Sequence, residues 1–396
     1  MRLIRLTPWR VLLWLMVGVG GVITVLRYAR GLGAVTNLSD RFPWGLWVGF
    51  DIMCGVALAA GGFTVAGLVY VLHLERYHPL VRPAIVTGFL GYLLVIAALL
   101  VDLGRPYRIW HALIMWNPHS VMFEVAWCVM LYTLVLSLEF GQVVLDRLGR
   151  TSLLRMTRMA LPPLVIAGVI LSTLHQSSLG ALFLIVPGKL HALWYTPMLP
   201  VLFFLSALAV GLAMVTVESS VSSRVFGRSL ELPQLRGLGT GTAHALTLYL
   251  VVKVADLVAR GAWPLAFQAT VEAAMFALEV GVGVVVPLVL LSHPHTRRSA
   301  RTIGIAAGLA VLGVVLNRLN VGVTGMLASS GARYVPSWME VQITLAIVAA
   351  GVLAYLWISE HLPIFRTEGR AAEFADEGLI GVGPPGPVPV AGTAAE

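Results

Sequence analysis

The sequence predicts an all-α integral membrane protein with about ten membrane-spanning helices. Of its 396 residues, 58% are hydrophobic and only 12% are charged, which is more apolar surface than a water-soluble domain can bury. The apolar residues also fall in runs of roughly 20, the helix length that crosses a hydrocarbon core about 30 Å thick. We therefore expect a multi-pass helical protein without a soluble domain.

Each apolar run of this length is expected to form one span. The runs cover residues 11–28, 44–73, 83–102, 119–140, 159–180, 194–217, 240–260, 265–291, 302–319 and 337–359. Pro43, Pro118 and Pro264 stand just before three of them, where a missing N–H costs a helix least. Pro79 and Pro83 are expected to interrupt the chain between the second and third spans.

The two ends of the chain differ from the spans in composition. Arg2, Arg5 and Arg10 flank the start of the first run, as in a secretory signal, but no small-residue cleavage site precedes the second run. We therefore expect the first helix to be retained. From Glu368 the chain is rich in Gly, Pro and Ala, so residues 368–396 are expected to form a disordered cytoplasmic tail.

Arginine and lysine favour one side of the membrane. Of the 27, 17 lie at the N-terminus, in the even-numbered loops and in the tail, nine lie in the odd-numbered loops and adjoining helix ends, and Lys253 lies within a span. The positive-inside rule therefore places both termini in the cytoplasm. The net charge of +8 fits this topology and contact with anionic lipid, without a clustered basic face for nucleic acid.

Few residues could hold a redox cofactor. Cys54 and Cys128 lie inside spans, so they provide neither a disulfide framework nor the four thiolates of an iron–sulfur cluster. A b-type haem needs two histidines at matching depth on facing spans, but His175 and His244, the histidines clearly within spans, lie towards opposite sides. We expect no haem and no iron–sulfur cluster in this chain.

The predicted topology brings polar residues from four spans to one outer layer. Span two begins with "FPWGLWVGFD", span three ends with "DLGRPYRIW", span four begins with "NPHSVMFEVAW", and span five ends with "LHQSSLG". The layer consists of Asp51, Asp102, Arg105, Glu124, His175 and Gln176. Ionisable groups are costly in hydrocarbon unless they are paired or line a wet cavity, so this layer is the candidate functional site.

Structural roles remain open for several of these residues. Asp102 and Arg105 are three residues apart and can neutralise each other at a helix end. Gln176 and its neighbouring serines can form ordinary hydrogen bonds between helices, whereas Asp51 and Glu124 have no partner within their own spans. Trp residues at the span ends fit an interfacial aromatic belt; these are Trp44, Trp47, Trp110 and Trp116.

Two further groups of polar residues lie elsewhere in the spans. One group is interpreted as structural pairing, with an i,i+3 pair of Lys253 and Asp256; its members are Lys253, Asp256, Glu272, Asn317 and Arg318. The other lies at the cytoplasmic ends of spans two and four, where protons would enter; its members are His73, Glu75, Glu139 and Gln142.

Eight motifs stand out between residues 25 and 365: "FPWGLWVGFD", "AAGGF", "RYHPLVRPA", "DLGRPYRIW", "NPHSVMFEVAWCVMLY", "LHQSSLG", "LHALWYTPMLPVLFFLSA" and "RYVPSWME". In combination they resemble the HybB branch of the NrfD/polysulfide-reductase membrane-subunit family, the cytochrome b-type subunits of periplasmic nickel–iron hydrogenases. The resemblance implies two four-helix bundles with flanking helices. The expected divisions are residues 1–28, an N-terminal helix; 44–180 and 194–319, the bundles; and 337–360, a C-terminal helix.

The resemblance also implies a function in the bacterial inner membrane. A subunit of this kind exchanges electrons between a periplasmic ferredoxin-like iron–sulfur subunit and membrane quinone, in complex with a catalytic nickel–iron hydrogenase. Whether it also translocates protons is left open. The quinone, menaquinone or ubiquinone, is expected near the periplasmic face. Open alternatives are the membrane subunit of a polysulfide, nitrite or other molybdoenzyme-type reductase, a secondary transporter and a structural anchor.

Quinone chemistry suggests a role for each residue of the outer layer. Both carbonyl oxygens take up a proton on two-electron reduction, so the pocket needs hydrogen-bond donors and a group that exchanges protons. We expect His175 to bind one carbonyl and Asp51 or Glu124 to relay protons. The other expected pocket residues are Asp102, Arg105, Trp47, Gln176, Ser177 and Ser120.

Reporter fusions test the predicted topology. Reporters on both termini are expected to report the cytoplasm, and a reporter in the loop near Asn117 is expected to report the periplasm, because the positive-inside rule acts on the loops that flank each span. Reversed signals would place the polar layer on the cytoplasmic side and rule out a periplasmic partner.

Overall fold

The described structure is all-helical, as expected. The computed structural model describes residues 7–185, 188–226, 232–331 and 334–364. Within these ranges there is no named strand, and ten helices are long and apolar enough to cross a membrane. The chain is therefore a multi-pass membrane protein with the expected number of spans. The proposed disordered tail, residues 368–396, lies outside the described residues.

Several spans consist of more than one helical segment. In chain order the spans are α1 (Pro8–Arg30); η2 (Trp47–Ile52), α2 (Met53–Leu58), α3 (Gly61–Ala66) and η3 (Gly67–Val71); α4 (His78–Asp102); α6 (Val121–Arg147); α8 (Leu161–Leu182); α9 (Leu199–Phe226); α10 (Leu232–Ala259); α11 (Val271–Val280), η7 (Gly281–Val285) and α12 (Val286–Ser292); α13 (Ala300–Leu319), η9 (Asn320–Thr324) and α14 (Gly325–Ser330); and α15 (Trp338–His361). Short helices connect them: η1 (Leu32–Ala34), η4 (Glu75–Tyr77), η5 (Pro106–Arg108), α5 (His111–Ile114), α7 (Thr151–Met159), η6 (Trp263–Phe267) and η8 (Thr296–Arg298).

Three expected boundaries were wrong. Helix α4 contains both Pro79, in its first turn, and Pro83. Neither proline therefore separates the second span from the third in the expected way, because the helix continues through both. Pro264 lies in η6, and the eighth span begins later, at Val271, where the Thr270 hydroxyl accepts a hydrogen bond from the helix N-terminus. The ninth span continues beyond residue 319, to Ser330.

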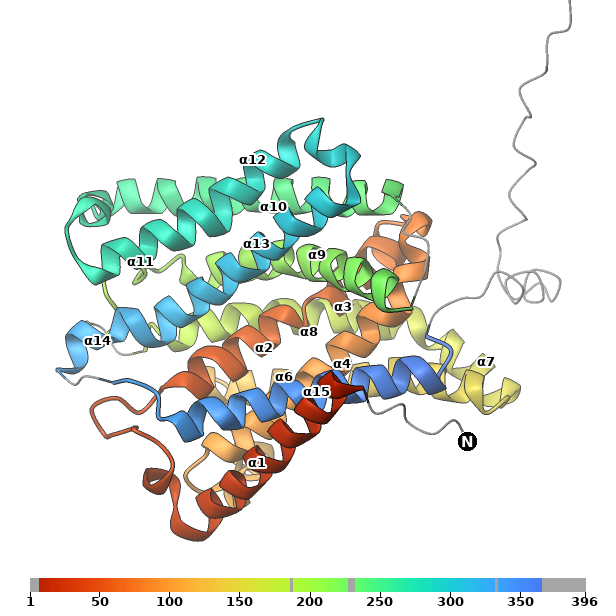
Figure 1. Ribbon diagram of the computed structural model, residues 1–396, viewed down its shortest axis with the longest axis horizontal. Coiled ribbons are helices and arrows are strands. Elements are labelled where there is room, and N and C mark those ends of the chain that lie inside the picture. Colours follow the sequence, from red (N-terminus) through yellow and green to blue (C-terminus); the bar gives the residue numbers. More distant parts are fainter. Residues whose placement is uncertain (1–6, 186–187, 227–231, 332–333, 365–396) are drawn as a thin grey trace, which may run out of the picture.

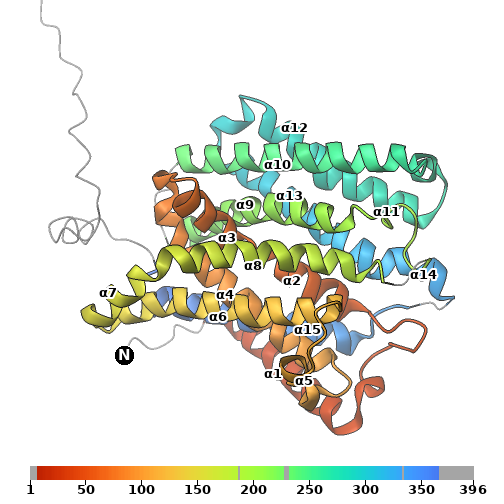
Figure 2. The same ribbon diagram turned by 180° about the vertical axis from the view of Figure 1, so that it is seen from behind.

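The spans pack as two rings of helices. In the first ring α3 contacts α4, α4 contacts α6, α6 contacts α8, and α8 contacts α3; in the second, α9 contacts α10, α10 contacts α12, α12 contacts α13, and α13 contacts α9. Helix α9 also packs along α8 and α3, which joins the rings. Figures 1 and 2 show α10 and α12 along one edge of the molecule and α1 along the opposite edge. We call the end where α1 begins the inner end and the other the outer end, after the predicted topology.

Pairs of glycines mark two places where the helices touch most closely. A Cβ atom on Gly283 in η7 would lie 2.2 Å from the Cα of Gly313 in α13, and one on Gly322 in η9 would lie 2.9 Å from the Cα of Gly49 in η2. Segments η2, η7 and η9 are π-helical turns, whose extra residue changes the direction of the side chains that follow. Backbones therefore cross directly at π-helical turns in both halves of the chain.

The first and last spans form a pair beside the first ring. Helix α1 packs principally along α15, with Gly20 against Ala346, and α15 packs on α4. The buried guanidinium of Arg27 donates from Nε to the carbonyl oxygen of Val101 at 2.6 Å and from Nη2 to that of Leu103. A cation at the carboxyl end of α4 satisfies carbonyls that the helix leaves unpaired and complements its dipole.

The Arg27 contacts give a stability prediction. Arg27→Met is expected to lower the free energy of unfolding by about 2–4 kcal/mol, because two buried carbonyl oxygens lose a charged donor. Thermal unfolding of the purified protein in nanodiscs measures the loss. Arg30→Met, which changes an exposed residue one turn away, is the control, and equal losses in the two variants would contradict the capping role.

Candidate functional site

The side chains of His175 and Gln176 lie in the core of the first ring. Both are on α8 and both are 0% exposed. The Tyr92 hydroxyl on α4 lies 2.7 Å from Nδ1 of His175, and the Gln176 amide donates to the carbonyl oxygen of Val56 at 3.0 Å. Each side chain therefore has one atom held by a neighbouring helix.

The opposite atoms of these side chains have no partner. Two buried polar atoms of this part of the first ring lack a hydrogen bond within the described residues, His175 Nε2 and Gln176 Oε1. The hydroxyl groups of Ser172 and Tyr132 lie within hydrogen-bonding reach of each other. The Tyr132 ring packs edge-on against Tyr92, with 4.7 Å between ring centroids, and Ser172 lies on α8 one turn before the His175–Gln176 pair. Buried polar groups are nearly always paired, so this cluster suits a polar ligand or bound water.

A cleft opens at the outer end of α8. It has a volume of about 90 Å³, and its walls include Trp44, Phe183 and Met326, with Arg41 and Lys189 also lining it. Trp44 and Phe183 meet edge-on, with 5.4 Å between ring centroids. Phe183 follows His175 by about two helical turns, so the cleft lies above the His175 cluster.

Asp51 belongs to a separate cluster between η2, α4 and α15. Its side chain is 7% exposed and accepts a hydrogen bond from Thr344 at 2.7 Å, so it is held by another span. Asp102, at the end of α4, lies within electrostatic reach of both Asp51 and Glu340. Three carboxyl groups therefore gather here, apart from His175.

Trp47 and Tyr334 complete the carboxyl cluster. Trp47 is buried and donates to the carbonyl oxygen of Glu340 at 3.2 Å, so its assignment to an interfacial belt was wrong. Tyr334 accepts from the Leu46 amide at 2.8 Å and donates to the Glu340 carboxylate at 3.2 Å. Burial raises the pKa of Tyr334 above its usual value, which keeps its hydroxyl a neutral donor.

The other predicted site residues lie at the edge of these clusters. Ser120 caps α6 by accepting from the Phe123 amide at 3.5 Å, and Glu124 is partly exposed in the first turn of that helix. Arg105 is exposed and forms no ion pair with Asp102 in the described chain, so the alternative in which the two neutralise each other does not hold. Ser177 is half-buried and bonds to neither cluster within the described residues.

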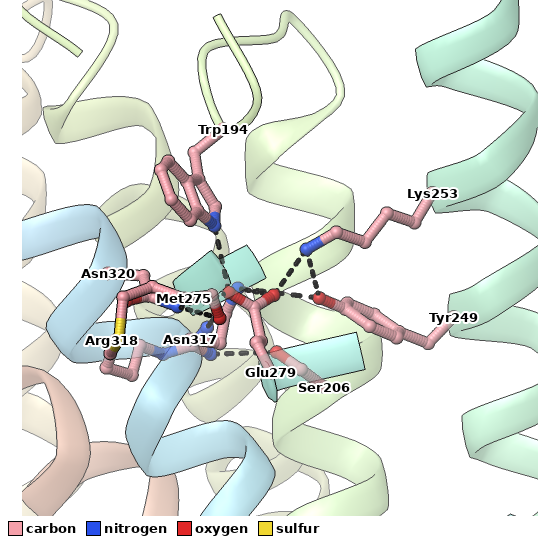
Figure 3. Close-up of polar contacts among 9 residues, drawn as sticks. All are labelled: Trp194, Ser206, Tyr249, Lys253, Met275, Glu279, Asn317, Arg318 and Asn320. Atoms are coloured by element: carbon pink, nitrogen blue, oxygen red, sulfur yellow. Dashed lines mark hydrogen bonds and ion pairs between the residues drawn. The ribbon is translucent and has the colours of Figure 1, made fainter. Parts of the chain in front are cut away.

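The second ring contains the most extensive polar network, centred on the Glu279 carboxylate (Figure 3). Lys253 Nζ lies 2.5 Å from Glu279 Oε1, and both side chains are almost completely buried. Three uncharged donors complete the shell at 2.8–2.9 Å: Trp194, Asn317 and Asn320. The expected pair of Lys253 and Asp256 was therefore wrong, because Asp256 pairs with Arg260 at 2.7 Å.

Arg318 adds a second buried cation to this network. Its guanidinium donates to Asn317 at 2.7 Å and to Ser206 at 2.9 Å, and it lies over the Phe203 ring at 3.6 Å from the centroid. The expected structural pairing of this group is thus present for Lys253, Asn317 and Arg318, whereas Glu272 is not bonded to the network in the described chain. Two buried cations share one buried carboxylate.

Three key residues were missed by the sequence analysis. Glu279 is the only charged residue in the apolar run "FALEVGVGVV". Because a buried charge is costly, this residue could have been recognised from the sequence as a candidate. Tyr92 and Tyr132 left no such signal, because tyrosine in an apolar helix is equally well explained as a packing residue.

Comparisons with known proteins place these features in context. The sequence profile of the family described as "Polysulphide reductase, NrfD" matches residues 34–329. A protein of Nitratidesulfovibrio vulgaris is 39% identical, covering 91% of this chain and 95% of its own length. The "Probable Ni/Fe-hydrogenase 2 b-type cytochrome subunit" of Escherichia coli is 34% identical over 87% of this chain and 88% of its own. The "Menaquinone reductase, integral membrane subunit" of N. vulgaris is 29% identical over 91% and 92%.

The charge balance around Glu279 predicts unequal effects of two substitutions. Glu279→Gln leaves Lys253 and Arg318 without a counter-charge and is expected to cost about 3–5 kcal/mol of folding free energy. Lys253→Met leaves one cation for one carboxylate and is expected to cost less. The double variant should be more stable than Glu279→Gln alone.

Thermal unfolding and the yield of membrane-inserted protein measure the three variants. Equal losses from both single substitutions, with no recovery in the double variant, would show that the network does not depend on charge balance.

Proposed function

The chain belongs to the polysulphide reductase NrfD family, and from this premise we propose that it is the quinone-reactive membrane subunit of a respiratory oxidoreductase. The names of two relatives, a hydrogenase b-type cytochrome subunit and a menaquinone reductase membrane subunit, support the proposal. Within it we favour a periplasm-facing nickel–iron hydrogenase in the bacterial inner membrane, with both termini in the cytoplasm.

The unpartnered Nε2 of His175 and Oε1 of Gln176, both fully buried, are the observation that carries the proposal. A quinone head group has two carbonyl oxygens, which accept hydrogen bonds and take up protons on reduction. If the Tyr92 hydroxyl donates to Nδ1 of His175, the neutral imidazole carries its proton on Nε2 and presents it to a carbonyl oxygen. Ser172 and Tyr132 supply hydroxyl groups beside it.

The cleft at the outer end of α8 provides the access route. Its aromatic walls suit contact with a planar ring. Leu179, which is fully buried, lies on α8 between the cleft and His175. We propose that this side chain moves aside when the head group reaches the imidazole.

Electrons are assigned to a partner subunit. Within the described residues no group of three or more His, Cys, Asp or Glu is arranged to hold a metal ion. His175 is the one buried histidine of the described chain, so the residues present do not offer a pair of buried axial ligands for a b-type haem. The absence of haem remains a prediction, and a ferredoxin-like iron–sulfur subunit is the proposed electron donor or acceptor.

The outer end carries the charge that such a partner would meet. Exposed cations there outnumber exposed carboxylates. The exposed carboxylate is Asp40, and the exposed cations are Arg30, Arg41, Arg105, Arg108 and Lys189. Opposite charges on two protein faces accelerate and orient their association. We therefore propose that the partner presents an acidic face.

Buried carboxyl groups suggest routes for protons on both sides of His175. On the outer side Asp51, beside Asp102, and the partly exposed Glu124 are the proposed proton relays. On the inner side Glu139 is 5% exposed and has no hydrogen bond or ion pair with a described residue. It follows Tyr132 by two turns of α6 and so lies on the same helix face. This arrangement supports proton uptake from the inner side as part of the proposal.

A second candidate function differs only in the catalytic partner. A relative from Mesobacillus selenatarsenatis that is named as a selenate reductase subunit is 23% identical over 89% of this chain. The same quinone geometry would serve a molybdoenzyme-type reductase. The proteins that co-purify with the chain distinguish the two functions.

Substitution of His175 tests the quinone site. In the assembled complex, His175→Ala is expected to lower quinone turnover by about two orders of magnitude, the contribution of one positioned acid–base group. Tyr92→Phe should lower it less, because the imidazole stays while the bond that orients it is lost. Dyes that exchange electrons directly with the iron–sulfur partner should react at the normal rate.

Arg224→Gln, an exposed change at the inner end, is the control and should leave both activities unchanged. If His175→Ala lowers complex yield and dye activity together while quinone turnover per complex stays normal, His175 is a packing residue and the site assignment fails.

A further inference from the structure

A buried carboxyl group in the inner half of the protein has no role in the proposed quinone chemistry. Glu218 lies on α9, two turns before the helix ends at its inner end. One of its oxygens, Oε1, accepts a hydrogen bond from the Tyr355 hydroxyl on α15 at 2.6 Å. The four ion pairs within the described chain do not include Glu218. A carboxyl group between spans without a cation is a candidate functional site by default.

Side-chain oxygen atoms from three helices gather at this place. Ser222 Oγ is buried and has no hydrogen bond within the described residues. Ser222 is 7% exposed and follows Glu218 by one helical turn on the same face of α9. Thr87 reaches the same carboxyl group from α4. Three helices thus direct oxygen atoms into one site.

The neighbouring charged groups are engaged elsewhere. Arg82, on the inner turns of α4, pairs with Asp146, and Glu360, on α15, pairs with Arg10. His361 is bonded to the carbonyl oxygen of Trp357, and Arg224 is exposed. Among the described residues, therefore, no protein cation neutralises Glu218.

The chemistry of the site indicates what neutralises the Glu218 carboxylate. An ionised carboxylate is very costly in an apolar interior unless its charge is compensated. Carboxylate and hydroxyl oxygens are the ligands of hard cations, and a single carboxylate balances one positive charge. We propose that Glu218, Ser222, Thr87 and Tyr355 form a binding site for a monovalent cation, held either as a proton on the carboxyl group or as Na⁺.

This site is distinct from the quinone site. Thr87 and Tyr92 are five residues apart on α4, which places their side chains on nearly opposite faces of the helix. The proposal does not depend on quinone binding or on any partner protein. It can therefore fail while the proposed function stands, and the reverse also holds.

Two measurements on the purified full-length protein in nanodiscs test the proposal. The first is the unfolding temperature in NaCl against choline chloride at equal ionic strength. The second is the infrared carbonyl band of protonated carboxyl groups at neutral pH. Glu218→Gln and Tyr355→Phe are the site variants, and Glu360→Gln is the matched control on the exposed ion pair.

Either of two results supports the site. If Na⁺ is bound, NaCl raises the unfolding temperature of the wild type and of Glu360→Gln, while Glu218→Gln shows no rise and Tyr355→Phe needs about tenfold more salt. If a proton is bound, NaCl has no specific effect, but one protonated carboxyl band is present, disappears in Glu218→Gln and shifts in Tyr355→Phe. If Glu218→Gln does not fold, Tyr355→Phe alone tests the proposal, through the shift of the carbonyl band or the weakened response to Na⁺. No Na⁺ response together with no band assignable to Glu218 would overturn the proposal.

Discussion

The Glu279 carboxylate shows the constraint under which this structure is built. A charge between membrane helices cannot be left to solvent, so every helix that carries one must meet helices that compensate it. Lys253 comes from α10, Glu279 from α11, Asn317 and Arg318 from α13, and Trp194 from the connection before α9. The position of each helix in the second ring is thereby tied to the others through one carboxyl group.

The π-helical turns show how the backbone meets this constraint. Glu279 lies two residues before η7, and Asn320 is the first residue of η9. At each turn one extra residue rotates the chain, which lets polar side chains on two sides of a helix both point inward. The glycine crossings at Gly283–Gly313 and Gly49–Gly322 add backbone contact at the same places. Close approach and polar convergence are therefore produced by the same short segments.

The number and order of spans could be predicted because they depend only on the length of apolar runs. The ninth span is predicted to end at residue 319, whereas the chain stays helical to Ser330. His175 and Asp51 were predicted from the cost of burying them. Their placement in separate clusters could not be predicted, because depth along a helix is readable from sequence while the direction of a side chain around the helix depends on packing. Glu218 shows the same limit, since it stands close to a charged helix end.

The pairing of α1 with α15 has a consequence for biosynthesis. The ribosome makes α1 first and its main packing partner last, and at 5–20 residues per second the interval is roughly half a minute. During that time α1 must remain in the membrane without the surface that receives Gly20. The carbonyl oxygens of Val101 and Leu103, by contrast, emerge after only about a quarter of the chain. Arg27 can therefore tether the nascent first helix to α4 early, and the groove against which α15 closes is then held in place before the last span leaves the ribosome.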